Sequence, residues 1–466
     1  MLLYSFGLLA QPVSSLEQYL QAVQQQAWQA KIAGSENLRA QAAYRLFTTS
    51  LRPQVMLQAF APVFTRTSSS VVQPNGSIFF QPLFQNNASL SVSVQQPLPF
   101  TGGTLFVETI LDRFDDFGQK VTLYNGIPLR LGYRQSLVGF NPWKWDKKIE
   151  KQRLELSKTQ YGQDMAAINV AAVNLYFEAL LAMANLGIAD SNRLVNEKLL
   201  LIAEERLQLG KISEDEKLQM EAEYRQSVIQ LAQAKSIWQQ AVYGMANMLP
   251  GIKEVSKQLA TPKVFELSIP EAESLQAMAM AQSPAVRSVA LQLLSERRSA
   301  AQVKSEMSPT FEILSTIGLA NSGGKLNEVY RQPFVEQQLR VGITVPLVDW
   351  GRKKAAVQQA GYRIERAEAE TNRQKDAIGN EVRQLHVHLH ELKDRLQAQF
   401  ALIDISEKRY KISTERYAAG AVLLTELVLA QRNKDQAIRD YLASLQQYYV
   451  AWHTLNGLIG GNLAMK

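Results

Sequence analysis

The chain has 466 residues and a formal net charge of +7, from 50 Lys and Arg against 43 Asp and Glu. No dense basic block with interleaved aromatic residues accompanies this charge, so the sequence does not predict nucleic-acid binding. Cysteine is absent, which excludes disulfides, thiolate metal sites and a lipid-bearing N-terminal cysteine. Any attachment to a membrane must therefore come from the fold itself.

Residues 1–11 are mostly apolar and are followed by polar sequence. This pattern is typical of the remnant of a secretory signal without its basic first part, and a frayed apolar N-terminus is the alternative. We find no later run of about 20 apolar residues that would predict a membrane-spanning helix. If the chain crosses a membrane, it is expected to do so as strands.

The chain contains two copies of one unit. The run from Gly132 to Gly210 recurs without a gap from Gly342 to Gly420, a constant shift of 210 positions (342 minus 132). In both copies apolar residues recur at alternating steps of four and three, which is typical of a coiled-coil seam. The matched residues are Ile168, Ala172, Leu175, Ala179, Ala182 and Leu186 in the first copy, and Ile378, Val382, Leu385, Leu389, Leu392 and Leu396 in the second. Each copy is therefore expected to be built on one very long helix.

The first repeat is expected over residues 12–251. It comprises, in chain order, helices at 14–50, strands at 51–138, a long helix at 141–209 and a return helix at 213–248. Asn141 and Pro142 are a typical cap and first residue of a helix, while Gly210 and Ser213 are typical of a turn between helices. Both helical parts must lie on the same side of a membrane, so the number of crossing strands in this half must be even, two or four.

The second repeat is expected over residues 271–466, after a proline-containing linker at 252–270. It comprises helices at 271–307, strands at 309–347, a long helix at 351–419 and a return helix at 423–458. The strand at 337–347 shows the clearest alternation. One of its faces carries Leu339, Val341, Ile343, Val345 and Leu347, and the other carries Gln338, Arg340, Gly342 and Thr344.

Strands with one apolar and one polar face suit a barrel with lipid outside and water inside. Four to six strands per chain cannot close a barrel alone, because known membrane barrels have at least eight. The expected fold is therefore mainly α, with tandem long helical hairpins and a β-barrel portion that several copies of the chain share. A sheet of a soluble sandwich is the alternative interpretation of the alternation.

Four segments of the second half occur in an order that resembles the TolC family of outer-membrane efflux proteins, with degenerate copies in the first half. They are Ser283-Pro-Ala-Val286 to Met307-Ser-Pro309, Val345-Pro-Leu-Val-Asp-Trp-Gly351, Arg416-Tyr-Ala-Ala-Gly420 and Thr425-Glu-Leu-Val-Leu-Ala-Gln431. The segments Gln95–Gly103 and Phe140–Lys148 are similar to the branch of this family found in Bacteroidetes-type bacteria. The resemblance implies a homotrimer in the outer-membrane lipid, with one shared barrel and a periplasmic helical tunnel closed at its inner tip. It also implies docking to a periplasmic adaptor protein and an inner-membrane pump, and outward passage of solutes.

The resemblance places candidate functional residues at the two helix turns. Glu216 and Glu426 match the tip carboxylates of the family and would form acidic rings in a trimer. The alternative for both is a first-turn acid that stabilises the N-terminus of its helix. Tyr417 matches a gate tyrosine that bonds across to the half-one turn, here around Asp215 and Glu216, and packing is its alternative role. The turns themselves centre on Gly210 and Gly420, while Val422 and Leu429 depart from the family's gate arginine and second acid.

Other chemistry has little support in the sequence. His386 and His390 have the spacing of a metal-binding pair on a helix, but His388 falls on another face and no further ligand has matching spacing, so no metal site is expected. We identify no nucleophile with a base and no phosphate-binding loop, and we expect neither enzymatic activity nor a cofactor. The rival function is that of a periplasmic coiled-coil adaptor or scaffold without a pore.

Overall fold

The computed structural model describes residues 14–137, 139–249, 258–263 and 269–461. The expected signal remnant at 1–11 lies outside these residues, as do residues 252–257 and 264–268 of the expected linker. The chain divides into two compact units, which we describe separately. One is mainly helical and comprises Met1–Arg39, Leu156–Arg287 and Asn372–Lys466; the other contains the sheet and comprises Ala40–Glu155 and Ser288–Thr371.

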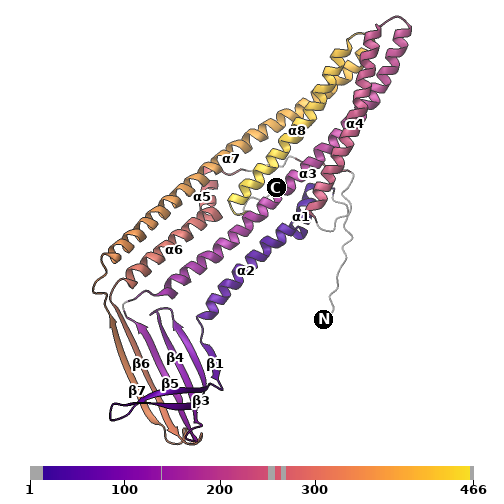
Figure 1. Cartoon of the computed structure of the whole chain (residues 1–466). Coiled ribbons are helices and arrows are strands. Elements are labelled where there is room, and N and C mark those ends of the chain that lie inside the picture. The colour runs from indigo at the N-terminus through magenta and orange to yellow at the C-terminus, as the bar shows by residue number, and fades with distance from the viewer. Residues whose placement is uncertain (1–13, 138, 250–257, 264–268, 462–466) are drawn as a thin grey trace. The chain divides into compact units, whose positions relative to one another are not determined.

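Eight described helices follow the duplicated plan (Figure 1). They are α1 (Leu16–Gln26), α2 (Trp28–Ser50), α3 (Pro142–Gln208), α4 (Glu214–Met248), α5 (Ala272–Gln282), α6 (Pro284–Glu306), α7 (Arg352–Ala418) and α8 (Leu424–Leu458). The two long helices α3 and α7 have 67 residues each and the two return helices α4 and α8 have 35 each. A helix of that greater length measures about 100 Å, and the equal lengths match the repeat seen in the sequence.

The core of the helical unit lies along the predicted seams. On α3 the residues Ala172 and Ala179 are fully buried, and on α7 Val382, Leu389 and Leu392 are fully buried. They join α1, α5 and α8 in one apolar cluster. The residues at the alternating steps of four and three therefore face the core in both copies, which confirms the predicted seam.

One expectation about membrane spans is wrong. Among the described helices, α3 does include a stretch that is long and apolar enough to cross a membrane by length and composition. Its side chains Tyr176, Phe177 and Leu180 are buried in the core of the helical unit. Asn169, Asn174 and Glu178 interrupt the stretch, so the sequence shows no continuous apolar run there.

All described strands belong to one antiparallel sheet. They are β1 (Gln54–Phe60), β2 (Phe64–Val72), β3 (Ile78–Leu98), β4 (Gly103–Asp116), β5 (Val121–Ser136), β6 (Thr310–Gly323) and β7 (Phe334–Thr344). Their order is β1-β3-β4-β5-β6-β7, and β2 pairs with the first part of β3 while β1 pairs with its last part. The first half thus supplies four positions across the sheet and the second half two. A single sheet does not support the soluble-sandwich alternative.

Outside the bulge in β4 and β5, cross-strand register assigns the paired residues of these strands to one of two faces. Val55 pairs with Val94, Val94 with Val107, and Val107 with Leu131. Partners in register share a face, so the first face can be followed from β1 to β7. Its exposed apolar residues are Val55, Leu57, Leu90, Leu105, Leu129, Leu131, Ile317, Val335, Leu339, Val341 and Ile343. The opposite face carries polar residues on the same strands, among them Ser89, Ser91, Ser93, Glu108, Arg130, Thr316, Glu336, Gln338 and Arg340.

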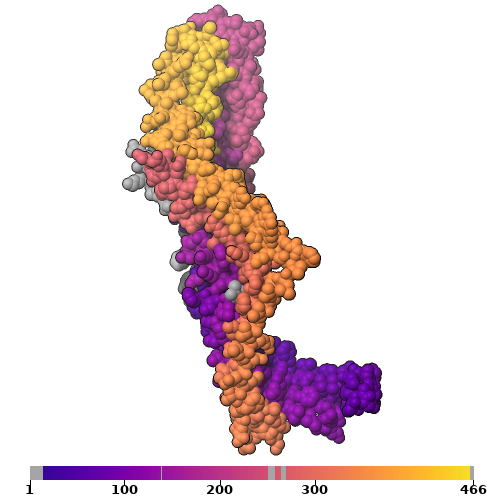
Figure 2. Space-filling model, turned by 90° about the vertical axis from the view of Figure 1, so that its left-hand side faces the viewer, coloured from indigo at the N-terminus to yellow at the C-terminus, as the bar shows by residue number. Residues whose placement is uncertain are grey.

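The sheet is curved, and its last strand is shorter than expected at the C-terminal end. Figure 2 shows the surface bending from the second-half strands (orange) towards the first-half strands (indigo). Strand β7 ends at Thr344, so Val345 and Leu347 lie beyond it. Pro346 is the second residue after Thr344, and a proline has no N–H to donate to a strand ladder.

Candidate functional site at the helix turns

The two helix turns have the same backbone geometry. Gly210 and Gly420 adopt positive φ angles of 66° and 79°. The N–H of Lys211 donates to the carbonyl of Arg206, and the N–H of Ala421 donates to that of Arg416, both at 2.9 Å. This is the Schellman arrangement that ends a helix with a left-handed glycine, as the sequence predicts at both positions.

The predicted acids lie in the first turns of the return helices. The N–H of Glu216 donates to Ser213 Oγ at 3.2 Å, so Ser213 caps α4 as expected. Glu216 is half-buried, whereas Asp215 and Glu426 are exposed. Within the described residues none of the three acids forms an ion pair, so their charges face solvent and the N-terminal ends of α4 and α8.

Tyr417 is buried, with 2% of its surface exposed. It packs in a separate small core at the turns, formed with Leu199, Ala203, Met220, Leu424 and Leu427. Burial raises the pKa of Tyr417, and the charge of Glu216 raises it further. The hydroxyl forms no hydrogen bond with Asp215 or Glu216 in the described part of the chain. The expected side-chain bond across the turns is therefore absent within one chain, because the ring lies inside the apolar cluster.

At the turns, a side-chain hydrogen-bond link between the two repeats comes instead from Arg206, whose role the sequence did not predict. Its Nη2 donates to the carbonyl oxygens of Tyr417 and Ala418, at 3.0 Å and 2.7 Å. Its guanidinium also lies 5.5 Å from the centre of the Tyr417 ring. The cation thus adds hydrogen bonds to two carbonyls in the last turn of α7, where the helix dipole favours positive charge. The available signal was a basic residue in the last turn of α3, but the sequence could not show which helix end it would reach.

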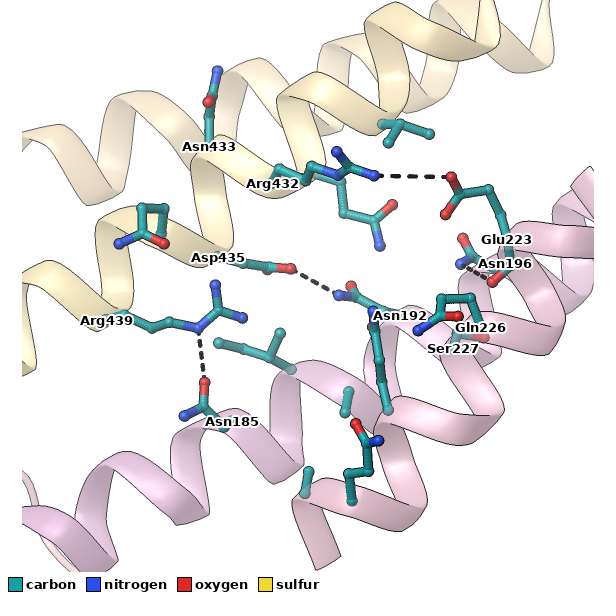
Figure 3. Close-up of a pocket in the computed structure, with 18 of the residues that line it drawn as sticks. Asn185, Asn192, Asn196, Glu223, Gln226, Ser227, Arg432, Asn433, Asp435 and Arg439 are labelled. Carbon is teal, nitrogen blue, oxygen red and sulfur yellow. Dashed lines mark hydrogen bonds and ion pairs between the residues drawn. The ribbon is translucent and has the colours of Figure 1, made fainter. Parts of the chain in front are cut away.

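A polar cavity of about 890 Å³ lies between α3, α4 and α8 (Figure 3). Asn192 Nδ2 donates to Asp435 Oδ2 at 2.7 Å, and both residues are buried. Arg439 Nε donates to Asn185 Oδ1 at 2.8 Å, and Arg432 lies 4.0 Å from Glu223. These contacts, which Figure 3 marks, join the return helix of one repeat to the hairpin of the other.

The lining of the cavity includes buried polar groups. Asn192 Oδ1 is buried and has no hydrogen-bond partner in the described residues. A roomy cavity with such acceptors favours water. The two hairpins therefore meet through polar contacts beside the cavity, whereas they meet through an apolar core farther along α3.

The polar face of the sheet carries a second charged cluster. Arg130 donates to Glu108 on one side at 3.2 Å and to Glu336 on the other at 3.3 Å. Gly318 is the register partner of both Arg130 and Glu336. The arginine can cross β6 to reach β7 because no side chain stands between them.

The histidines of α7 lie in two separate contacts. The rings of His386 and His390 have centres 4.7 Å apart, while His388 pairs with Glu391 at 3.2 Å. No cluster of three or more metal-ligating side chains occurs in the described ranges. Two imidazoles on one helix leave a tetrahedral metal short of ligands.

Comparisons with known proteins agree with the architecture. Residues 275–461 match the family described as "Outer membrane efflux protein". The chain is 19% identical over 340 residues to the alkaline protease secretion protein AprF of Pseudomonas aeruginosa, covering 72% of this chain and 70% of that protein. Nothing among the relatives found supports the adaptor or scaffold interpretation.

Two solved structures show the same fold. The Campylobacter jejuni CmeC outer membrane channel has a TM-score of 0.66 at 16% identity, covering 97% of this chain and 86% of that chain. The outer membrane protein VceC of Vibrio cholerae has a TM-score of 0.65 at 14% identity, covering 96% of each chain. At these identities the likeness concerns the fold.

Proposed function

The chain belongs to the TolC family of outer-membrane efflux proteins, and from this membership we propose that three copies assemble into one channel. The sheet would form part of a barrel in the outer membrane, and the helical hairpins would form a tunnel in the periplasm. The tunnel would dock to a periplasmic adaptor and an inner-membrane pump, as in tripartite efflux or type I secretion. Solutes would pass outward through it.

The observation that carries this proposal is the two-faced sheet. Its apolar face is exposed on every strand position, and its polar face holds charged residues. A strand buried in lipid must have all its backbone groups paired, which only a closed barrel provides. Six strand positions cannot close one, so copies must combine.

The turns would form the inner end of the tunnel. Glu216 and Glu426 lie at equivalent positions, six residues after the turn glycines. In a trimer they would contribute acidic rings, and Tyr417 together with Arg206 would hold the ends of the two hairpins of a chain together. Asp215 would add charge beside Glu216.

Membrane fractionation and electrophoresis test the assembly. We expect the protein to require detergent, to migrate as a trimer in SDS until it is boiled, and to produce conductance steps in planar lipid bilayers. A water-soluble monomer whose sheet is stable without detergent would refute the proposal.

A further inference from the structure

The sheet has two open edges. Among the described strands, β1 pairs only with β3 at one edge, and β7 pairs only with β6 at the other. The outer backbone groups of both strands are therefore free in a single chain. In a bilayer each unpaired N–H or C=O costs several kcal/mol (~2–7), so both edges need a partner.

The first strands share the apolar face of the others. Val55 and Leu57 on β1 are each 70% exposed, as Leu339 on β7 is 71% exposed. Register places them on the same side of the sheet. Strands β1 and β3 thus have the surface of a lipid-facing wall, as β4 to β7 have.

Strand β1 is also long enough to cross. Beyond its last residue, Val63 and Asn87 exchange two backbone hydrogen bonds of 3.2 Å and 3.0 Å. Pairing along β3 therefore extends from Gln54 to Val63, which is within the roughly 9–11 residues of a membrane strand.

The directions of the two edges fit one another. Neighbours in the sheet are antiparallel throughout. With an even number of positions, β1 and β7 run in opposite directions. A second copy can therefore place its β1 beside β7 and continue the antiparallel pattern without a break.

We propose that β7 of each copy pairs with β1 of the next, so that three copies close a barrel of eighteen strands, six from each. This inference rests on the proposed trimer and adds which strands make its wall. The alternative is that the β1–β3 hairpin stands outside the wall, so that β4 becomes the edge and the trimer has twelve strands. The difference matters for function, since barrels of about 16–18 strands enclose a water-filled channel.

Engineered disulfides distinguish the two barrels, because the chain has no native cysteine. Cysteines replace Gln54, Met56 or Gln58 on β1 and Gln338 or Arg340 on β7, all on the polar face. A second series replaces Glu108 or Ile110 on β4 together with Gln338. Direct cross-strand neighbours have Cα atoms about 4.5–5.5 Å apart, which is within the reach of a disulfide.

After oxidation in native membranes, we expect at least one β1–β7 pair to give covalent dimers and trimers on boiled, non-reducing gels. The control variant combines Gln58→Cys with Thr316→Cys on β6, which is not an edge strand, and should remain monomeric. Linked β4–β7 pairs, or no linked pair in either series while unboiled samples still run as trimers, would overturn the eighteen-stranded barrel and leave the channel intact. Loss of the unboiled trimer in the cysteine-free parent would instead count against the proposed function.

Discussion

Arg206 joins the two repeats through backbone atoms of α7. The two carbonyls that accept its hydrogen bonds belong to the last turn of that helix. By the internal repeat its equivalent is Arg416, which is exposed and holds no such contact in the described chain. The two arginines are therefore a matched pair, of which only one links the hairpins.

We predict that Arg206→Met loosens the closed end of the channel. Hydrogen bonds that involve a charged group contribute about 1.5–3 kcal/mol, and 1.4 kcal/mol changes an equilibrium about tenfold. Single-channel recordings should show open events at least about tenfold more often, and Arg416→Met should match the parent. Tyr417→Phe should also match the parent, because the hydroxyl has no bond to lose, whereas Tyr417→Ala should open the channel by removing the packed ring. Equal effects of the two arginine variants would contradict this role.

The burial of His453 predicts that the helical unit loses stability in acid. The side chain is 4% exposed, and burial lowers its pKa from 6.5 to about 4. Folding therefore favours the neutral imidazole. The free energy of unfolding is therefore unaffected by this group above pH 6.5. It decreases as the pH falls from 6.5 towards 4, by about 3 kcal/mol once His453 is fully protonated.

We expect the thermal midpoint of the helical circular-dichroism signal to fall between pH 7 and pH 4. His453→Leu should reduce that fall, because the buried group no longer titrates. His386→Leu, at a half-buried position on α7, should retain it. A His453→Leu variant that loses as much stability as the parent over this range would refute the assignment.

The charged cluster of Arg130, Glu108 and Glu336 requires a residue without a side chain at position 318 of β6, so that Arg130 can reach Glu336. A Cβ there would lie 2.7 Å from the carbonyl oxygen of Leu129 and 3.0 Å from the Cα of Arg130. Both are backbone atoms, so a rotamer change cannot relieve the clash. On the neighbouring strand and the same face, a Cβ at Gly342 would have no neighbouring atom within 4 Å.

Gly318→Ala should therefore weaken the sheet, whereas Gly342→Ala should not. We expect the alanine at 318 to lower the temperature at which the trimer dissociates in SDS by several degrees, since clashes in a packed site cost about 1–3 kcal/mol. Heating series on gels measure this directly. If both variants dissociate at the temperature of the parent, the close approach at Gly318 has no structural importance.

The sequence predicted the elements whose signals are local. Helical periodicity gave α3 and α7 their length and core side, and the turn glycines needed only their own positive φ. The contacts of Arg206 and Arg130 could not be predicted, because each depends on how distant segments register with one another. The same reason left two or four strands open in the first half, since alternation does not show which strands pair.

The charges along the proposed passage differ in what surrounds them. In the sheet, Arg130 offsets part of the charge of Glu108 and Glu336. At the turns, Glu216, Glu426 and Asp215 have no cation paired with them in the described chain. The narrow inner end would thus be acidic, while a wide barrel filled with electrolyte screens its charges beyond roughly 10 Å.

We therefore predict that cation preference is set at the turns. The double variant Glu216→Gln with Glu426→Gln should lower the potassium-to-chloride permeability ratio in bilayer reversal-potential measurements, because the neutral rings no longer attract cations. Arg130→Gln should change the ratio less, and Glu407→Gln, an exposed acid more than two helical turns before Gly420, should leave it unchanged. If the double variant keeps the parental ratio but unfolds more readily, by about 0.3–1 kcal/mol per acid, the two glutamates serve only to stabilise the helix ends.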